Sequence, residues 1–167
     1  MYIRNREIVS DTWRIVGESG GALEGGFVLL PYSNWLDAIA EAKLSPKNIG
    51  AWLETSFDSS ELVRLPDVLA IQFDQFTDGR GYSLAKIIRG RIGFKGDLFA
   101  IGDVTRDQLL DLEKCGFNCF VLREDQDIHD SLEAFEEFNF SYRDSFVQKG
   151  SELETAGSKK LRHASGH

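Results

Sequence analysis

The sequence predicts an α/β domain in which repeated βα units surround a mainly parallel sheet. Short apolar runs begin near residues 27, 49, 68, 97 and 118, and helical or turn sequence follows each one. The runs are continuously apolar rather than alternating, which is typical of strands covered by helices. With 167 residues and a hydrophobic fraction of 42%, the chain can bury one sizeable core.

Two architectures satisfy this repeat: an open doubly wound sheet and a partial (β/α) barrel. Helical crossovers between parallel strands are right-handed in both. Both also place ligands and catalytic groups in the loops at the carboxyl ends of the strands. We therefore expect functional residues in the loops that follow the apolar runs.

The N-terminal region is expected to pair with itself. Tyr2–Arg4 and Glu7–Val9 flank a turn at Asn5 and Arg6, and Thr12–Val16 also has strand composition. The expected divisions are a β-hairpin with a glycine-rich loop in 1–26, a single α/β domain in 27–147 and a disordered tail in 148–167.

Helix boundaries are marked by capping residues. Ser33 is an expected N-cap, Thr105 and Gln108 form a capping box, and Gly93 and Gly116 lie at expected C-caps. The expected elements are, in order, strand 27–30, helix 34–44, strand 49–53, helical turn 59–65, strand 68–73, helix 81–92, strand 98–101, helix 106–115, strand 118–122, helix 128–138 and edge strand 139–146.

Composition excludes several classes of protein. The net charge of -8 disfavours nucleic-acid binding, because neutralising phosphates needs an excess of Lys and Arg. No apolar run reaches the roughly eighteen residues of a membrane span, and the N-terminus lacks a signal-peptide core. Two cysteines are too few for a disulfide framework, so a cytoplasmic location is expected.

Charge is unevenly distributed along the chain. Residues 79–96 contain five basic residues and no acid, whereas residues 124–137 contain seven acids and no Lys or Arg. A dipolar surface of this kind could steer a charged partner. The alternative is two solvated helix faces.

The segment Asp78-Gly79-Arg80-Gly81 is the first candidate site. Its glycines permit positive φ and close backbone approach, and the following helix offers free N–H groups. Arg80 could clamp an oxyanion bidentately, and Ser83 could add a hydroxyl. Together these residues describe a small-anion site, although neither a dinucleotide fingerprint nor a P-loop is present.

A structural interpretation of the same residues stays open. Asp78 could cap the helix while Arg80 pairs with Asp103 or Asp107 of a neighbouring loop. Asp103, Arg106 and Asp107 surround the next strand exit, where two carboxylates and an arginine could perform acid–base chemistry. Structural ion pairing is the alternative there as well.

The sequence shows no sign of a metal or a resident cofactor. Cys115 and Cys119 have a three-residue spacer, unlike a redox C-x-x-C motif, and Cys119 lies in an apolar strand. His129, His163 and His167 lack ligand spacing. Flavin, nicotinamide and iron–sulfur fingerprints are missing, so no cofactor is expected.

Four segments resemble a bacterial family of unknown function. They are Phe76–Arg89, Gly93–Val104, Arg106–Gln108 and Cys115–Phe117, and the resemblance extends from about Leu30 to Phe146. Members of that family are commonly encoded beside the sulfite reductase haemoprotein, and some are labelled oxidoreductases involved in sulfite reduction. The resemblance implies a pathway rather than a mechanism, because these residues supply no electron carrier of their own.

Two functions follow as hypotheses. The first is an accessory protein of assimilatory sulfite reduction, which assists electron delivery to sulfite reductase or its assembly. It would dock on the haemoprotein or its electron donor through the basic stretch from Arg80 to Lys95, including Arg89. The alternative is a small anion-binding protein or enzyme that holds sulfite, sulfate or a phosphorylated ligand at the Asp78 loop, opposite Asp103 and Arg106.

A third possibility is a direct oxidoreductase with bound flavin, which would purify as a yellow protein. Oligomeric state stays open.

Overall fold

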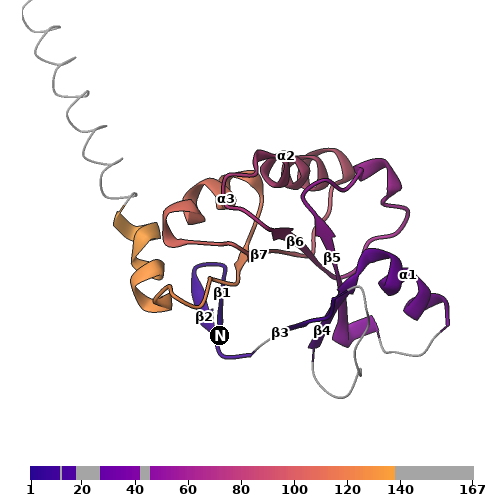
Figure 1. Cartoon of the computed structure of the whole chain (residues 1–167), viewed down its shortest axis with the longest axis horizontal. Helices are drawn as coiled ribbons and strands as arrows, with labels where there is room; N and C mark the ends of the chain where they lie inside the picture. Colours follow the sequence, from indigo (N-terminus) through magenta and orange to yellow (C-terminus); the bar gives the residue numbers. More distant parts are fainter. Residues whose placement is uncertain (12, 18–26, 42–45, 138–167) are drawn as a thin grey trace, which may run out of the picture.

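The computed structural model describes residues 1–11, 13–17, 27–41 and 46–137, which form a curled eight-stranded sheet, a half-barrel, with helices against it (Figure 1). The strands are β1 (Tyr2–Arg4), β2 (Glu7–Val9), β3 (Trp13–Ile15), β4 (Phe27–Pro31), β5 (Ile49–Glu54), β6 (Val68–Phe73), β7 (Asp97–Gly102) and β8 (Cys119–Phe120). The helices are α1 (Tyr32–Ala40), α2 (Gly79–Ile87), α3 (Leu109–Cys115) and residues 128–137, with 3-10 turns η1 (Pro46–Asn48), η2 (Ser59–Glu61) and η4 (Arg106–Gln108) and a π-helical turn η3 (Ile88–Ile92).

Strand order distinguishes the two expected architectures. The sheet runs β2-β1-β8-β7-β6-β5-β4-β3, so the six strands from β3 to β8 lie side by side in chain order. All five of these pairings are parallel, and only β1 is antiparallel, to β2 and to β8. A doubly wound sheet reverses its strand order, whereas this sheet advances in one direction. The arrangement is therefore that of the partial (β/α) barrel.

The curl of the sheet follows from a short connection. β2 and β3 are the two opposite edges of the sheet, yet β2 ends at Val9 and β3 begins at Trp13. Four residues of extended chain span at most about 14 Å. The sheet must bend until its edges approach each other, and rings from distant strands consequently meet inside. Phe99 of β7 lies 5.1 Å from the Tyr2 ring and 5.9 Å from the Trp13 ring, centroid to centroid.

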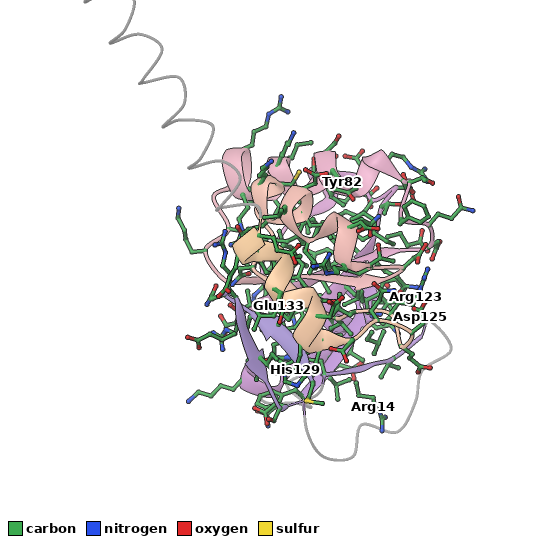
Figure 2. The ribbon with its side chains drawn as sticks, turned by 90° about the vertical axis from the view of Figure 1, so that its left-hand side faces the viewer. Arg14, Tyr82, Arg123, Asp125, His129 and Glu133 are labelled. Carbon is green, nitrogen blue, oxygen red and sulfur yellow. The ribbon has the colours of Figure 1, made fainter. Side chains whose placement is uncertain are left out.

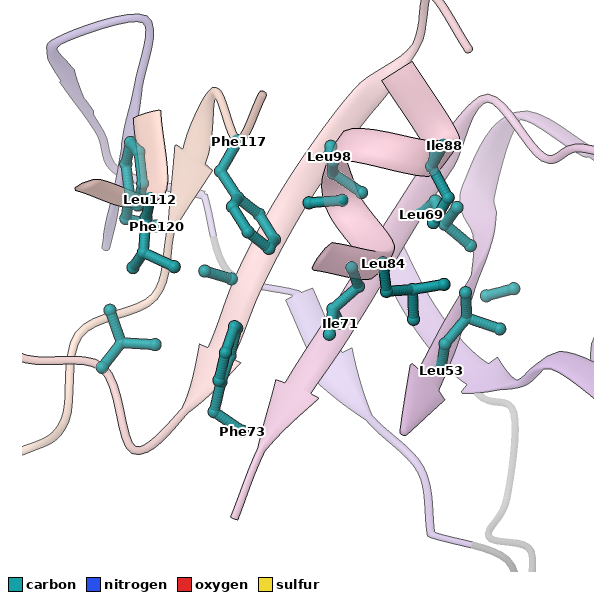
Figure 3. Close-up of a cluster of buried hydrophobic side chains, with 14 of the residues drawn as sticks. Leu53, Leu69, Ile71, Phe73, Leu84, Ile88, Leu98, Leu112, Phe117 and Phe120 are labelled. Carbon is teal, nitrogen blue, oxygen red and sulfur yellow. The ribbon is translucent and has the colours of Figure 1, made fainter. Parts of the chain in front are cut away.

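The two faces of the sheet have separate cores. On the outer face, helix residues such as Leu84 and Ile88 pack on Leu69, Ile71 and Leu98 of the strands (Figure 3). The inner cluster consists of strand residues and their immediate neighbours: Tyr2, Leu29, Trp52, Ala70, Phe99, Ile101 and Cys119, with Val9, Trp13, Val68 and Val121 against them. Helices on one face only are what right-handed crossovers produce when strand order never reverses.

The N-terminal hairpin is confirmed, with one difference. Tyr2 pairs with Val9 across a turn in which Asn5 and Arg6 have φ of 50° and 65°. The strand expected in 12–16 exists as β3, but it pairs in parallel with β4 at the far edge of the sheet. Strand composition reveals a strand without revealing its partner.

Several helix ends follow the sequence signals, but α1 does not, α2 begins at Gly79 rather than 81, and the turn expected over 59–65 ends at Glu61. The Thr105 and Gln108 capping box is present, and Gly93 and Gly116 terminate their helices with φ of 76° and 114°. The Ser33 cap is wrong, because α1 begins at Tyr32 directly after Pro31 and has no side-chain cap. The glycine-rich segment 18–26, the edge strand 139–146 and the tail 148–167 lie outside the described residues.

Candidate functional site

The loops after β5, β6, β7 and β8 meet at the carboxyl edge of the parallel strands. They are joined by side-chain bonds between neighbours: Thr55 follows β5 and bonds Asp78 from the loop after β6. Asp103 follows β7 and bonds both the β6 loop and Arg123 from the chain after β8. The candidate residues on these loops thus belong to one connected surface.

Asp78 caps α2, as the structural interpretation expected. Its Oδ1 accepts from the Arg80 backbone N–H at 3.1 Å, and Thr55 Oγ1 donates to Oδ2 at 2.6 Å. The Arg80 guanidinium donates to both carboxylate oxygens, from Nε at 3.0 Å and from Nη2 at 2.8 Å. The bonds from Arg80 and then Thr55 hold the pKa of Asp78 far below its usual range. Arg80 therefore pairs with Asp78 rather than with the expected Asp103 or Asp107.

The glycines of this segment serve packing. Gly79 and Gly81 would permit positive φ but do not adopt it; the described glycines with positive φ are Gly93, Gly102 and Gly116. A Cβ at Gly81 would overlap the ring of Phe73 and approach Thr55 Cγ2 to 3.0 Å. The backbone at Gly81 does approach another group closely, but that group is the ring of Phe73 in β6. A Cβ at Gly79 would meet nothing within 4 Å.

A groove of about 570 Å³ runs beside the start of α2. Gly79, Arg80 and Ser83 line one wall, and residues 55–59 line the other. The Arg80 side chain is 67% exposed, and its pairing with Asp78 uses Nε and Nη2 rather than Nη1. Ser83 Oγ makes a long 3.4 Å bond to the carbonyl of Gly79. An anion here would contact the outer edge of Arg80 beside an existing carboxylate.

Asp103, in the loop after β7, connects the loop after β6 to the chain after β8. Its Oδ2 accepts from the Phe76 backbone N–H at 3.0 Å, and its Oδ1 accepts from Arg123 Nη1 at 2.8 Å. Arg123 also donates to both carboxylate oxygens of Asp125, from Nε at 2.6 Å and from Nη2 at 2.8 Å. Figure 2 labels both residues. These bonds, first those to Asp125 and then that to Asp103, raise the pKa of Arg123 well above its ordinary value.

Phe76 is an aromatic residue held in an exposed position. Phe76 is 49% exposed, although its backbone N–H and its carbonyl both form hydrogen bonds. The N–H donates to Asp103, and the carbonyl accepts from Gln108 Nε2 at 2.9 Å. Gln108 Oε1 in turn accepts from the Thr105 N–H at 3.2 Å. We call Phe76, Asp103, Arg123 and Asp125 the Phe76 surface. Sequence reasoning missed its central residue.

Arg106 and Asp107 do not face Asp103. Arg106 Nη2 donates to Glu137 at 3.0 Å, and its Nε lies 3.2 Å from an oxygen of Asp130. Asp107 is exposed in the first turn of η4. Arg106 thus fastens the 128–137 helix, and the structural ion pairing considered for this group describes its contacts.

Arg89 lies at the opposite end of the strands from the candidate surface. Its Nε donates to the Gly116 carbonyl at 2.8 Å, and its Nη1 donates to the Phe94 and Gly96 carbonyls at 2.9 and 2.8 Å. Nη2 donates to Asn118 Oδ1 at 3.0 Å. Burial lowers the pKa of this guanidinium. Its donors point into its own chain, so it is not brought together with Arg80.

The acidic run is also largely engaged. Asp125 pairs with Arg123, and Asp127 caps the 128–137 helix through the N–H groups of His129 and Asp130. Asp130 and Glu137 pair with Arg106. Glu133 and His129 lie on the exposed side of this helix (Figure 2). Internal contacts therefore use much of the charge that sequence counting assigned to a steering surface.

The thiols are buried. Cys115 and Cys119 are both free, and burial raises the pKa of Cys119 to about 12 and that of Cys115 in the same direction. Within the described ranges, no group of three or more His, Cys, Asp and Glu side chains is arranged to hold a metal ion. Among the helices described, none has the length and apolar character to cross a bilayer.

Comparison with known proteins identifies a family but no relative of known function. Neither the curated proteins nor the solved structures contain a significant match. The profile of one family, described as "Bacterial protein of unknown function (DUF934)", matches residues 50–152. The match includes β5 to β8 with the loops that carry Thr55, Asp78, Asp103 and Arg123, and it covers more than half of the chain. This protein is a member of the DUF934 family.

Proposed function

We propose that this protein is an accessory component of assimilatory sulfite reduction that docks on sulfite reductase or its electron donor through the Phe76 surface. The pathway is what the family resemblance implies. The docking role is supported by one observation, the exposure of Phe76 on a backbone fixed at both its N–H and its carbonyl.

A fixed, exposed aromatic ring favours association. Binding energy concentrates in aromatic and arginine side chains that become fully buried at the centre of an interface. Ordering a mobile loop opposes binding, but here the bond from the Phe76 N–H to Asp103 and the bond from Gln108 to the Phe76 carbonyl already hold this loop. Arg123, 45% exposed, and its carboxylate partners supply a polar rim beside the ring.

The charged groups around Phe76 support binding better than acid–base catalysis. Pairing lowers the pKa values of Asp78 and Asp125, and it raises that of Arg123. These groups stay ionised across neutral pH, whereas a general acid or base works best with a pKa near the working pH. Their geometry positions loops and the aromatic ring.

Co-purification with the sulfite reductase haemoprotein and, separately, with its electron donor tests the proposal. The protein is expected to associate with one of them at low salt, and Phe76→Ser is expected to weaken that association about tenfold. Val63→Ser is the matched control, since Val63 is 79% exposed on another loop. The docking role would be refuted if the protein associated with neither the haemoprotein nor the electron donor. It would also be refuted if the Phe76→Ser variant bound as tightly as the unmodified protein.

Growth of a deletion strain tests the pathway independently. A strain lacking this protein is expected to grow on sulfide and to grow poorly on sulfite, and the Phe76→Ser gene should fail to restore growth on sulfite. Equal growth of the deletion strain on both sulfur sources would refute the assignment to sulfite reduction.

Anion binding is the second candidate function, favoured by the exposed outer edge of Arg80 in the groove with Ser83. Calorimetry with sulfite, sulfate and inorganic phosphate tests it. Binding at millimolar concentrations should be lost in Arg80→Gln and kept in Arg91→Gln, which alters an exposed arginine. The Asp78 carboxylate already caps the start of the helix, which opposes the binding of a second anion there. Absence of a binding heat at millimolar anion concentrations would eliminate this candidate.

A further inference from the structure

A second cavity, of about 300 Å³, opens at the carboxyl ends of β4 and β5. It lies between α1 and the chain that follows β5. Its lining consists of Pro31, Tyr32, Ser33, Leu36, Trp52, Leu53, Glu54, Phe57 and Glu61. None of these residues belongs to the Phe76 surface, and this volume is within the range of small-ligand sites.

The aromatic wall of the cavity is fixed by bonds directed elsewhere. The Tyr32 hydroxyl donates to the Arg64 carbonyl at 2.7 Å and accepts from the Arg64 N–H at 3.1 Å. Trp52 Nε1 donates to the Val16 carbonyl at 2.9 Å. The Tyr32 and Phe57 rings meet edge to face, 5.5 Å apart at an interplanar angle of 79°. With its hydroxyl engaged, Tyr32 offers ring surface to the cavity, as Phe57 does, whereas the Trp52 side chain belongs to the inner cluster.

Among the described residues, the charged part of the lining is acidic. Glu54 and Glu61 are both exposed, and no Lys, Arg or His of the described ranges lines the cavity. The Glu54 carboxylate accepts a long bond from Ser56 Oγ at 3.4 Å, and within the described chain neither carboxylate has an ion-pair partner. This contrasts with Asp78, Asp103 and Asp125, each of which holds an arginine. A cavity with this lining attracts cations and repels anions.

From this lining we propose that the cavity binds an organic cation, an alkylammonium or guanidinium group on an aliphatic stem. The ring faces attract a cation electrostatically, and Glu54 and Glu61 supply compensating charge at the rim. Leu36, Leu53 and Pro31 offer apolar surface for the stem. A bare metal ion would leave this apolar part of the cavity unused. The site does not depend on the proposed role in sulfite reduction.

Titration of the full-length protein with a matched pair of probes tests the inference. Nα-acetyl-lysine methylamide carries the cation, and Nα-acetyl-norleucine methylamide has nearly the same stem without charge. Followed by the backbone amide resonances of Glu54, Phe57 and Glu61, the lysine probe is expected to bind with a Kd of about 1–10 mM and the norleucine probe at least about fivefold more weakly. Added salt should weaken only the lysine probe.

Variants locate the charge that is recognised. Glu54→Gln and Glu61→Gln are each expected to weaken lysine-probe binding about threefold to fivefold, and the matched control Glu133→Gln, an exposed acid of the 128–137 helix, should leave it unchanged. Butylamine and a lysine-containing peptide distinguish a free amine from a protein side chain as the source. Equal binding of both probes, insensitivity to the two variants, or no resonance shift up to about 50 mM would overturn the proposal.

Discussion

Arg89→Met tests whether this arginine is structural. The substitution keeps an aliphatic stem beside Phe94 but removes four hydrogen bonds, three to the carbonyls of Gly116, Phe94 and Gly96 and one to Asn118. Each such bond contributes about 0.5–1.5 kcal/mol net, and the desolvation of the partly buried guanidinium offsets part of the sum. We expect a loss of about 3 kcal/mol in the free energy of unfolding.

Urea denaturation measures this loss. With an m value of about 2 kcal/mol/M, the midpoint should fall by about 1.5 M. Arg91→Met removes the same charge from an exposed neighbour two residues away and should change the unfolding free energy by less than about 0.5 kcal/mol. A loss below about 1 kcal/mol for Arg89→Met, or equal losses for both variants, would refute the structural role.

Three further predictions concern the start of α2 and the thiols. Gly81→Ala should cost about 1–3 kcal/mol, because its Cβ would overlap a ring of β6, whereas Gly79→Ala enters open space and should change the unfolding free energy by less than about 1 kcal/mol; equal urea midpoints would contradict this packing. Asp78→Asn should destabilise more at pH 7 than near pH 3, since the lowered pKa of Asp78 contributes stability that is present above about pH 4 and lost as the pH falls; a difference independent of pH would contradict it. Cys115 and Cys119 should resist iodoacetamide at about pH 8 in the folded protein and react fully once it is unfolded, as mass spectrometry can show; rapid labelling of folded protein would contradict their burial.

The elements of the fold were predictable because their signals are local. The apolar runs near 49, 68 and 97 are strands with those starts, and continuous apolarity correctly indicated burial on both faces. The capping box at Thr105 also depends only on residues three positions apart. Sequence could not choose between the architectures, because strand order depends on which edge each new strand joins.

The candidate site was predictable in composition but less so in contacts. Asp78 and Asp103 were expected at strand exits, and the structure joins the loops that carry them. The partner of Arg80 is its near neighbour Asp78, which is the N-cap of α2 and bonds both the backbone and the side chain of Arg80. Phe76 was missed because exposure cannot be deduced from an apolar residue in a charged loop. Its one local signal is an aromatic side chain that continues no apolar period.

The direction of α2 along the sheet determines which partners its basic residues can contact. The helix starts at the carboxyl end of β6 and returns to the amino ends of β7 and β8, so its two ends face opposite edges of the sheet. Arg80 at its start is exposed beside the candidate surface, and Arg89 in the turn after its end is bonded to the chain before β7 and β8. A single partner that recognised the basic stretch as one charged patch would have to contact both edges. The charge contrast in the sequence therefore supports a smaller surface at the carboxyl edge, where Phe76 supplies apolar contact and Arg80 and Arg123 supply charge.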